Sequence, residues 1–289
     1  PGGHRHFAND ADGIAALASW ASGHAAELVA MEATGGIEQP AFLALWQTGT
    51  PCAIANPKQV RRFAEAMGRL EKTDRIDAEL IAQFAEARRM RPSPPPSQQQ
   101  QRLTALTARL RQVTADLSIQ KQRLHSTHDD FALAGLGEII TLLKKQIKAL
   151  AAEIASLVKH DPLWTALDQT LRSVKGVADR TVAILLAELP EIGTLSNKQI
   201  AKLAGLAPIA NDSGKRSGKR PIRGGRTAVR SILYLVADIA RKYDQSLTDF
   251  RQRLLDQGKP KMVVRLALAR KLLVRLNAKA RDARRELAA

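Results

Sequence analysis

Three acidic residues in the first third of the chain have the types and spacing to bind a divalent metal ion. Asp74 and Asp77 stand three positions apart in KTDRIDAELIAQ, so on a helix both carboxylates project from one face. Glu32 ends the apolar run AELVAME, which predicts a buried strand, and strand ends often carry the catalytic groups of α/β folds. Converging carboxylates repel one another unless a hard cation such as Mg²⁺ neutralises them, and Mg²⁺ held in this way assists attack on phosphodiesters.

The local spacing also has a simpler interpretation. An Asp at a helix N-cap with a second acid in the first turn is ordinary capping, and it complements the helix dipole. Asp74 and Asp77 fit that pattern as well as they fit a metal site. Both interpretations therefore stay open on the local sequence.

A polar loop in the last third of the chain could supply a nucleophile. The segment NDSGKRSGKRPIRGGRT (211–227) combines two Ser-Gly pairs with closely spaced Lys and Arg. It reads either as a loop that grasps phosphates through serines and backbone amides, or as a loop with one nucleophilic serine. In the second case, neighbouring cations stabilise charge on the phosphoryl oxygens. No Ser-His-Asp set is evident, because the histidines lie near the N-terminus and in mid-chain.

The charge of the chain predicts a polyanionic partner. The net charge is +17 and the pI about 10.5, and residues 211–289 hold 21 Lys and Arg against 7 Asp and Glu, which is +14 of that total. Aromatic residues are only 4% of the chain, so base stacking is not the main mode of binding. The predicted nucleic-acid contacts come from the loop and from the vicinity of the acids: Lys215, Arg216, Lys219, Arg220, Arg223, Arg226, Arg230, Lys72 and Arg75.

Cysteine content and hydropathy predict a protein of the reducing cytoplasm. Cys52 is the single cysteine, which excludes an intramolecular disulfide, and its place in TPCAIANP predicts a buried strand in which a thiol behaves as a small hydrophobe. No apolar run approaches the roughly 20 residues of a membrane-spanning helix, and no signal-peptide pattern opens the chain. The opening PGGHRHFAND has no Met and resembles the inside of a strand, so we expect elements before Pro1.

Residues 1–92 predict an α/β domain. Apolar runs typical of buried strands alternate with helical patterns closed by Gly or Pro, which indicates a layer with some parallel pairing. The predicted strands are 26–36 and 51–57, and the predicted helices are 38–49, 58–70 and 73–90.

A Pro/Gln-rich linker at 93–102 is followed by a predicted arm at 103–165. Leucine, isoleucine and valine recur at 3-4 spacing from Leu103 to Leu124 and from Ile140 to Leu157, around an irregular patch with Gly135 and Gly137. Such spacing predicts two coiled-coil helices, either folded back as a hairpin or paired with a second copy. A helical bundle within one domain is the alternative.

Residues 166–289 predict an all-helical basic domain. Helices are expected over 171–190, interrupted by a tight Gly turn, and over 196–210, 228–242, 245–256 and 260–287. The turn in SVKGVADRT reads either as a helix-hairpin-helix whose amides hold a DNA phosphate, or as a turn that simply needs Gly176. Ala178 stands where the fuller motif has a second Gly, so neither reading is preferred.

Four segments together carry a resemblance to a known family. In order they are VAMEATGG, ANPKQVRRFAEAMGRLEKTDRIDAELIAQFAEA, SVKGVADRTVAILLAELP and LAGLAPIANDSGKRSGKRPIRGGR. The chain closely resembles the DEDD-type insertion-sequence transposases, which include pilin-gene-inverting and bridge-RNA-guided recombinases. The resemblance spans essentially all 289 residues, and KTDRIDA with LAGLAP…SG is its most specific part.

The resemblance implies a ribonuclease H/RuvC-like α/β N-terminal domain, a coiled-coil arm and an all-α C-terminal transposase domain. Glu32, Asp74 and Asp77 match the second, third and fourth metal-binding acids of the family, and Ser213 matches its nucleophilic serine. Ser217 is the less favoured alternative, and it arises because Ser217 and Gly218 form a second Ser-Gly pair in the same loop. The first acid, an Asp on the opening strand, has no counterpart here, and its strand is expected before Pro1.

The implied function is an Mg²⁺- or Mn²⁺-dependent DNA recombinase of an insertion sequence. Ser213 would form a 5′-phosphoserine link to double-stranded DNA chosen by a structured bridge RNA, in a homodimer or homotetramer joined through the coiled coil. The setting would be a prokaryotic cytoplasm, at the nucleoid. One alternative is a RuvC-like nuclease in which metal-bound water is the nucleophile. Another is a non-enzymatic basic protein that packages or bridges nucleic acid.

Overall fold

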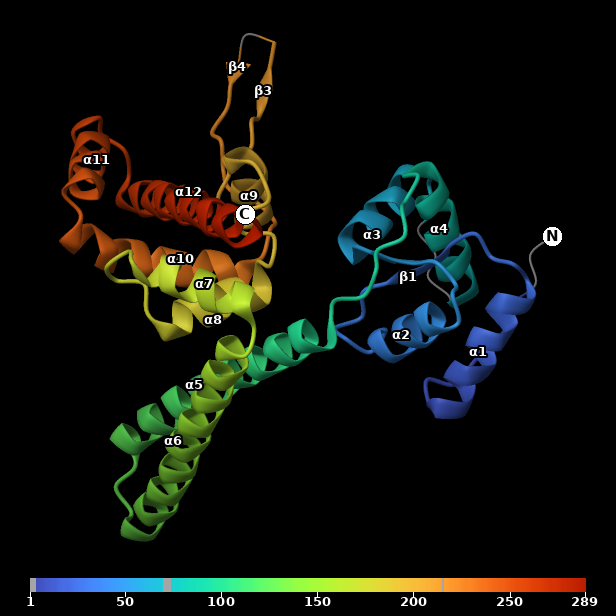
Figure 1. Ribbon diagram of the computed structural model, residues 1–289, viewed down its shortest axis with the longest axis horizontal. Helices are drawn as coiled ribbons and strands as arrows, with labels where there is room; N and C mark the ends of the chain where they lie inside the picture. Colours follow the sequence, from blue (N-terminus) through green and yellow to red (C-terminus); the bar gives the residue numbers. More distant parts are fainter. Residues whose placement is uncertain (1–3, 70–73, 215) are drawn as a thin grey trace. The chain divides into compact units, whose positions relative to one another are not determined.

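The chain divides into two compact units, Pro1–Ser97 and Gln98–Ala289 (Figure 1). The computed structural model describes residues 4–69, 74–214 and 216–289, with the backbone alone for 74–76, 216 and 217.

The N-terminal unit contains a parallel pair of strands among its helices. Strand β1 (Val29–Glu32) pairs with β2 (Cys52–Ala55), and Glu32 lies opposite Ala55. The predicted α/β layer with parallel pairing is confirmed for this pair. The helices are α1 (Ala11–Gly23), α2 (Gln39–Gln47), α3 (Pro57–Ala66) and α4 (Asp74–Ala87).

The strand expected at the start of the chain is wrong for the residues described there. Residues 4–10 form neither helix nor strand, and α1 follows them. The polar HRHFAND run offers no apolar alternation to bury, and Asp10 instead caps α1 by accepting a hydrogen bond from the Gly13 amide at 2.8 Å.

Two apolar clusters hold the N-terminal unit together. The first joins α1, α2 and the strands through Ala18, Ala21, Phe42, Leu45 and Cys52. The second joins β2, α3 and α4 through Ala55, Val60, Ala64, Leu80 and Phe84. Cys52 is fully buried in β2, which confirms the predicted buried strand, and burial raises the pKa of its thiol to about 11, as suits a small hydrophobe.

Two long helices form the arm of the C-terminal unit. Helix α5 (Gln98–Ser126) and helix α6 (Asp130–Lys159) pack against each other as a hairpin, so the fold-back arrangement is the one observed (Figure 1). The connection is short, and the Asp129 side chain begins α6 by accepting a hydrogen bond from the Ala132 amide at 2.9 Å.

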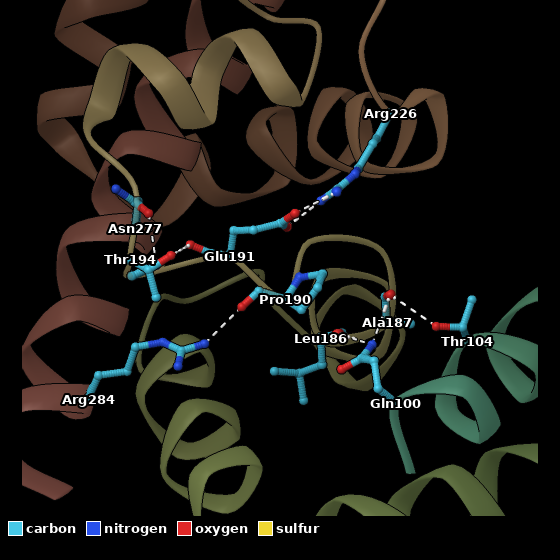
Figure 2. Close-up of polar contacts among 11 residues, drawn as sticks. Gln100, Thr104, Leu186, Ala187, Pro190, Glu191, Thr194, Arg226, Asn277 and Arg284 are labelled. Carbon is cyan, nitrogen blue, oxygen red and sulfur yellow. Dashed lines mark hydrogen bonds and ion pairs between the residues drawn. The ribbon is translucent and has the colours of Figure 1, made fainter. Parts of the chain in front are cut away.

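The arm differs from the prediction at its start and in its middle. Helix α5 already begins at Gln98, so the linker ends at Ser97. Gln is a good helix former, and the Gln100 side chain donates hydrogen bonds to the carbonyls of Leu186 and Ala187, both at 3.1 Å (Figure 2). The irregular patch at Gly135 and Gly137 is part of α6. A Gly costs a helix about 1 kcal/mol relative to Ala, which the packing of a long helix offsets.

The remaining helices form a body around α12. They are α7 (Pro162–Arg172), α8 (Asp179–Glu188), α9 (Asn197–Leu203), α10 (Thr227–Ala240), the 3-10 helix η1 (Arg241–Tyr243), α11 (Gln245–Asp256) and α12 (Lys261–Ala288). Helix α12 contacts α7, α9, α10 and α11, and its Leu268, Leu272, Leu273 and Leu276 are fully buried. The predicted helix at 196–210 ends at Leu203. No helix in the described part of the chain is long and apolar enough to cross a membrane.

Asn277, a fully buried polar residue on α12, holds the loop between α8 and α9. Its Oδ1 accepts a hydrogen bond from the Gly193 amide at 2.9 Å, and its Nδ2 donates to the Leu195 carbonyl at 3.0 Å. Gly193 has φ +86°, and a Cβ there would lie 2.8 Å from the Ala280 backbone. Arg284, two turns further along α12, donates to the Pro190 carbonyl at 2.8 Å (Figure 2). This loop leads directly into α9 and therefore fixes where α9 begins.

Replacing Asn277 tests this anchor. Asn277→Ala removes these two hydrogen bonds and a third, from Nδ2 to the Asn197 Oδ1 at 3.2 Å, and leaves the buried Gly193 amide unsatisfied. We therefore expect the free energy of unfolding to fall by about 2–4 kcal/mol. Urea unfolding followed by circular dichroism measures it. The exposed Lys279→Ala on the same helix is the matched control and should change stability by no more than about 0.5 kcal/mol. Equal stabilities of the two variants would contradict the anchor.

Candidate functional site

The structure brings together the elements that carry two of the predicted metal ligands. Glu32 lies at the carboxyl end of β1, and α4 contacts β1. Asp77 precedes the buried Leu80 by three positions, so it lies on the face of α4 that packs toward the strands. Asp74 begins α4 one turn earlier, but its side chain is outside the described residues, as is the whole of Lys72; Arg75 is described by its backbone alone.

Glu32 and Asp77 have the chemistry that a metal site needs. Both are partly exposed, and neither forms a hydrogen bond or ion pair through its side chain with another described residue. Carboxylates without a cationic partner suit a hard cation. No cluster of three or more His, Cys, Asp or Glu side chains occurs within the described part, which leaves Asp74 out. The three-acid cluster and the capping alternative both stay predictions.

Glu38, which the sequence did not single out, holds the turn after Glu32. Its Oε2 accepts hydrogen bonds from the amides of Thr34 at 2.9 Å and Gly36 at 2.8 Å. Burial opposes ionisation of Glu38, but these backbone hydrogen bonds outweigh burial and lower its pKa. Gly35 and Gly36 adopt φ +72° and +103° in this turn. The Gly-Gly pair with an acid two positions later is the sequence signal from which the turn could have been predicted. The turn fixes the backbone at the strand end that carries Glu32.

The described residues of the serine loop, 208–214 and 216–222, form a hairpin that projects from the body, and we call them the finger (Figure 1). Strands β3 (Asp212–Ser213) and β4 (Arg216–Ser217) pair antiparallel, with Ser213 opposite Arg216. Towards the body, the Gly218 amide donates to the Asn211 carbonyl at 3.2 Å, and the Ile209 amide donates to the Pro221 carbonyl at 3.1 Å. The finger therefore presents an exposed Ser213 near its tip, where the sequence predicted only a polar loop.

Backbone contact between glycines fixes the root of the finger. Gly205 (φ +68°) and Gly225 (φ +72°) approach so closely that a Cβ on Gly225 would lie 2.2 Å from the Gly205 nitrogen. A Cβ on Gly205 would lie 2.3 Å from the Gly224 carbonyl oxygen. The Arg230 guanidinium donates to that same oxygen at 2.6 Å. Since only Gly tolerates these conformations and distances, the two ends of the finger are held together at the body.

The predicted nucleic-acid contacts differ in how free their charges are. On the finger, Arg220 donates to the Asp212 carboxylate at 2.6 Å, which holds a guanidinium beside the serine strand. Lys219 and Arg223 are exposed and have no ion pair with another described residue. Lys215 lies outside the described residues, and Arg216 and Ser217 are described by their backbone alone.

Arg226 and Arg230 serve the structure of the finger's root. Arg226 forms a two-pronged ion pair with Glu191, with one contact of 2.6 Å (Figure 2). Burial opposes ionisation of Glu191, but Arg226 outweighs it and lowers the pKa of Glu191. Arg226 therefore contributes less free charge than Lys219 and Arg223. The sequence did not reveal Glu191 as its partner, because the two lie 35 positions apart.

The Gly176 turn packs tightly against the end of α10. Gly176 has φ +96°, and a Cβ there would lie 3.0 Å from the backbone nitrogen and Cα of Ala240. A cavity of about 580 Å³ lies beside the turn, and Lys175 and Lys279 are among its lining residues. Packing alone explains the Gly, so phosphate binding by this turn stays a prediction.

Comparisons with known proteins cover most of the chain. Residues 3–132 match the model of DEDD transposases of the IS110 type, described as transposase, and residues 168–252 match that of the transposase IS116/IS110/IS902 family. The pilin gene-inverting proteins of Moraxella lacunata and Moraxella bovis are each 26% identical over 278 residues, 92% of this chain and 85% of theirs. An uncharacterized 42 kDa protein of insertion element IS900 from Mycobacterium paratuberculosis is 40% identical over 89 residues, 30% of this chain and 22% of its own.

Glu38 should make the stability of the N-terminal unit depend on pH. Because its pKa is lowered in the folded state, its stabilisation is present above the unfolded value of about 4.5 and is lost as pH falls through the folded value. Glu38→Gln should destabilise the unit by about 1 kcal/mol at pH 7, and the difference should narrow towards pH 3.5. Urea unfolding followed by the fluorescence of Trp20 and Trp46, in a Trp164→Phe background, measures it.

The matched control is Glu65→Gln, on the exposed surface of α3. Glu65 pairs with Arg61 at 3.5 Å, and both side chains are about half exposed, so the pair contributes little. A pH profile of Glu38→Gln that runs parallel to the wild type would contradict the assigned role of Glu38.

Proposed function

This chain belongs to the DEDD transposases of the IS110 type, and from that premise we propose that it cuts and rejoins DNA through Ser213. Proteins of this kind recombine DNA. The observation that carries the choice of Ser213 is its exposed position on a finger whose root is fixed by the contact of Gly205 with Gly225. A nucleophile must be held in place relative to its target, because positioning accounts for much of the rate of such reactions.

In the proposed reaction, the Ser213 hydroxyl attacks the phosphorus of a phosphodiester. A serine O–P bond forms, the P–O3′ bond breaks, and the leaving 3′ oxygen takes up a proton as the serine proton is lost. The bond energy is kept in the 5′-phosphoserine link, so the reverse attack by a 3′ hydroxyl rejoins the strands without ATP. Arg220, held by Asp212, would stabilise negative charge on the phosphoryl oxygens together with Lys219 and Arg223, which have no ion pair with another described residue.

The N-terminal unit would supply the metal site. Its parallel strands and the packing of α4 on β1 support a ribonuclease H/RuvC-like fold in which Glu32, Asp74 and Asp77 hold Mg²⁺ or Mn²⁺. Such an ion, when bound, supplies Lewis-acid polarisation of the phosphate. Glu38 keeps the backbone of Glu32 in place, and Leu80 and Phe84 keep the face of α4 that carries Asp77 against β2 and α3.

The charge of the C-terminal unit supports nucleic-acid partners. The excess of +14 over residues 211–289 suits a phosphate backbone, whether of target DNA or of a guide RNA, because charge does not separate the two. The arm, a long hairpin with apolar residues left exposed, supports assembly into a homodimer or homotetramer. In such an assembly, the acids of one copy would act with the serine of another.

Covalent trapping tests the nucleophile. The chain is produced in cells that carry a plasmid with the insertion sequence that encodes it, the cells are lysed in SDS, and the DNA retained on protein is measured. Ser213→Ala should reduce the adduct to background, because the other serine of the finger, Ser217, lies on the opposite strand and is not expected to take its place. Ser217→Ala is the matched control. It should leave the amount of adduct within about twofold of wild type, which corresponds to about 0.4 kcal/mol.

Two outcomes would overturn the assignment. Loss of the adduct in Ser217→Ala, with retention in Ser213→Ala, would move the nucleophile to the other strand of the hairpin. Free cleaved ends without an adduct, abolished by Asp77→Asn, would favour a nuclease in which water attacks. The same variant, Asp77→Asn, distinguishes the recombinase and the nuclease from a protein that only packages nucleic acid. A packaging protein would keep all its activity in Asp77→Asn.

A further inference from the structure

An apolar cavity with a cationic rim lies at the root of the finger. Its volume is about 700 Å³, and it is bounded by the finger, α11 and α12. Its lining residues include the apolar Leu206, Ile222, Val263 and Leu266, which we call the floor, and the cationic Arg220, Arg270, Lys271 and Arg275, which we call the rim. The proposed reaction uses only Arg220 from this set, so the apolar floor has no role in it.

The rim carries more positive charge than its neighbours neutralise. Arg220 is paired with Asp212 and Arg275 with Asp244. Arg270 and Lys271 have no carboxylate partner among the described residues; the Lys271 ammonium instead lies 4.3 Å from the centre of the Phe250 ring. Burial lowers the pKa of Lys271, and Arg275 and Arg253 lower it further, against a smaller opposing effect of Asp244 and Asp249. The cavity therefore suits an apolar group accompanied by negative charge.

The tip of the arm has that combination. Phe131, in the first turn of α6, is 90% exposed, and Asp129 and Asp130 directly precede it. Glu138 follows two turns later, while Lys121 and Arg123 lie in the last turns of α5. Covering a Phe side chain that is otherwise left in water stabilises the contact that covers it. An acid pair beside an exposed aromatic ring complements the cationic rim in sign.

We propose that the arm tip of a second copy of this chain docks into the cavity, with Phe131 on the apolar floor and the acids facing Arg270 and Lys271. The inference rests on the proposed homo-oligomer and names the contact that holds it. It also ties assembly to the reactive loop, because the cavity lies against the root of the finger that carries Ser213.

The tip of the same chain cannot occupy its own cavity. The base of the arm shares one core with the body through the buried Leu103, Ile154 and Val158. The arm helices are about 45 Å long, at 1.5 Å per residue, and the tip and the finger lie at opposite ends of the C-terminal unit (Figure 1). A contact between different copies in which each donates a tip and receives one is closed by a two-fold axis, the commonest symmetry of homo-oligomers.

Site-directed disulfide formation tests the contact. Two single variants of the full chain, Phe131→Cys and Val263→Cys, carry tags of different size, are mixed without DNA and are oxidised with diamide. Val263 lines the cavity and is 48% exposed, whereas the native Cys52 is fully buried. The mixed disulfide should form at least tenfold faster than with the control partner Lys148→Cys, an exposed position in the middle of α6. Light scattering on the same samples gives the oligomeric state.

The outcomes separate this inference from the proposed oligomer. Oligomers that form no more Phe131–Val263 product than the Lys148 control would overturn the docking and leave the oligomer standing. Oligomers absent at every concentration would overturn both. A double variant Phe131→Cys/Val263→Cys that closes its disulfide within one chain at high dilution would also overturn the docking.

Charge reversal provides a second, independent measurement. Asp130→Lys and Arg270→Glu should each weaken association at least tenfold by sedimentation equilibrium, because like charges then face each other. The two single variants mixed together should recover most of that loss, since each then offers the opposite charge to the other. Recovery no greater than for Asp130→Lys mixed with the distant Lys148→Glu would contradict the proposed pairing. Neither result bears on Ser213 as the nucleophile, which the DNA adduct assay with Ser213→Ala tests separately.

Discussion

The contact between two glycine backbones at the root of the finger is the constraint on which the proposed reaction depends. Gly205 and Gly225 lie so close that any side chain would overlap main-chain atoms, so the two ends of the finger cannot separate without breaking the body. The support continues inward, because α9, which precedes Gly205, follows the loop that Asn277 holds to α12. The position of Ser213 thus depends on a series of contacts that ends at α12, whose Leu268, Leu272, Leu273 and Leu276 are fully buried.

The two kinds of chemistry are divided between the two units. In the N-terminal unit, Glu32 at the end of a strand and Asp77 on the facing side of a helix have no cationic partner among the described residues. In the C-terminal unit, the Ser213 hydroxyl lies on a finger rich in cations. A serine without a histidine partner depends on its electrostatic surroundings, and the finger supplies guanidinium and ammonium groups with few acids. Separate placement of acids and cations keeps the carboxylates free for a metal and the cations free for phosphates.

The sequence predicted what depends on local pattern. Apolar periodicity placed the helices α8 to α12 and the parallel strands, but it missed α7, which begins at Pro162 and ends near the start of the predicted 171–190 segment. The prolines before Ser97 placed the break between the units. The sequence prediction failed where distant contacts override local preference. Gly135 and Gly137 are helical because α6 packs along α5. Helix α5 begins as early as Gln98 because its first turn is held by the contact of Gln100 with the end of α8. The sequence predicts a loop at the finger because residues 208–222 contain few β-branched residues, which strands favour. The pairing of this segment reaches as far as Pro208 with Ile222.

The candidate site shows the same limit. Spacing alone left Asp74 and Asp77 between capping and metal binding, and only the resemblance to a family selected Ser213. Glu38 and Glu191 escaped notice because their roles are hydrogen bonds to a turn and to a distant arginine, which no spacing rule encodes. The choice between the two serines is chemical and needs the bonded atom to be identified.

Mass spectrometry of the covalent complex identifies that atom directly. Trypsin cuts after Lys202, Lys215, Arg216 and Lys219, so Ser213 and Ser217 fall in different peptides, 203–215 and 217–219. After nuclease trimming of the trapped DNA, the account predicts a nucleotide 5′-phosphate on Ser213 in peptide 203–215. The same modification on peptide 217–219, or on any peptide outside the finger, would contradict it.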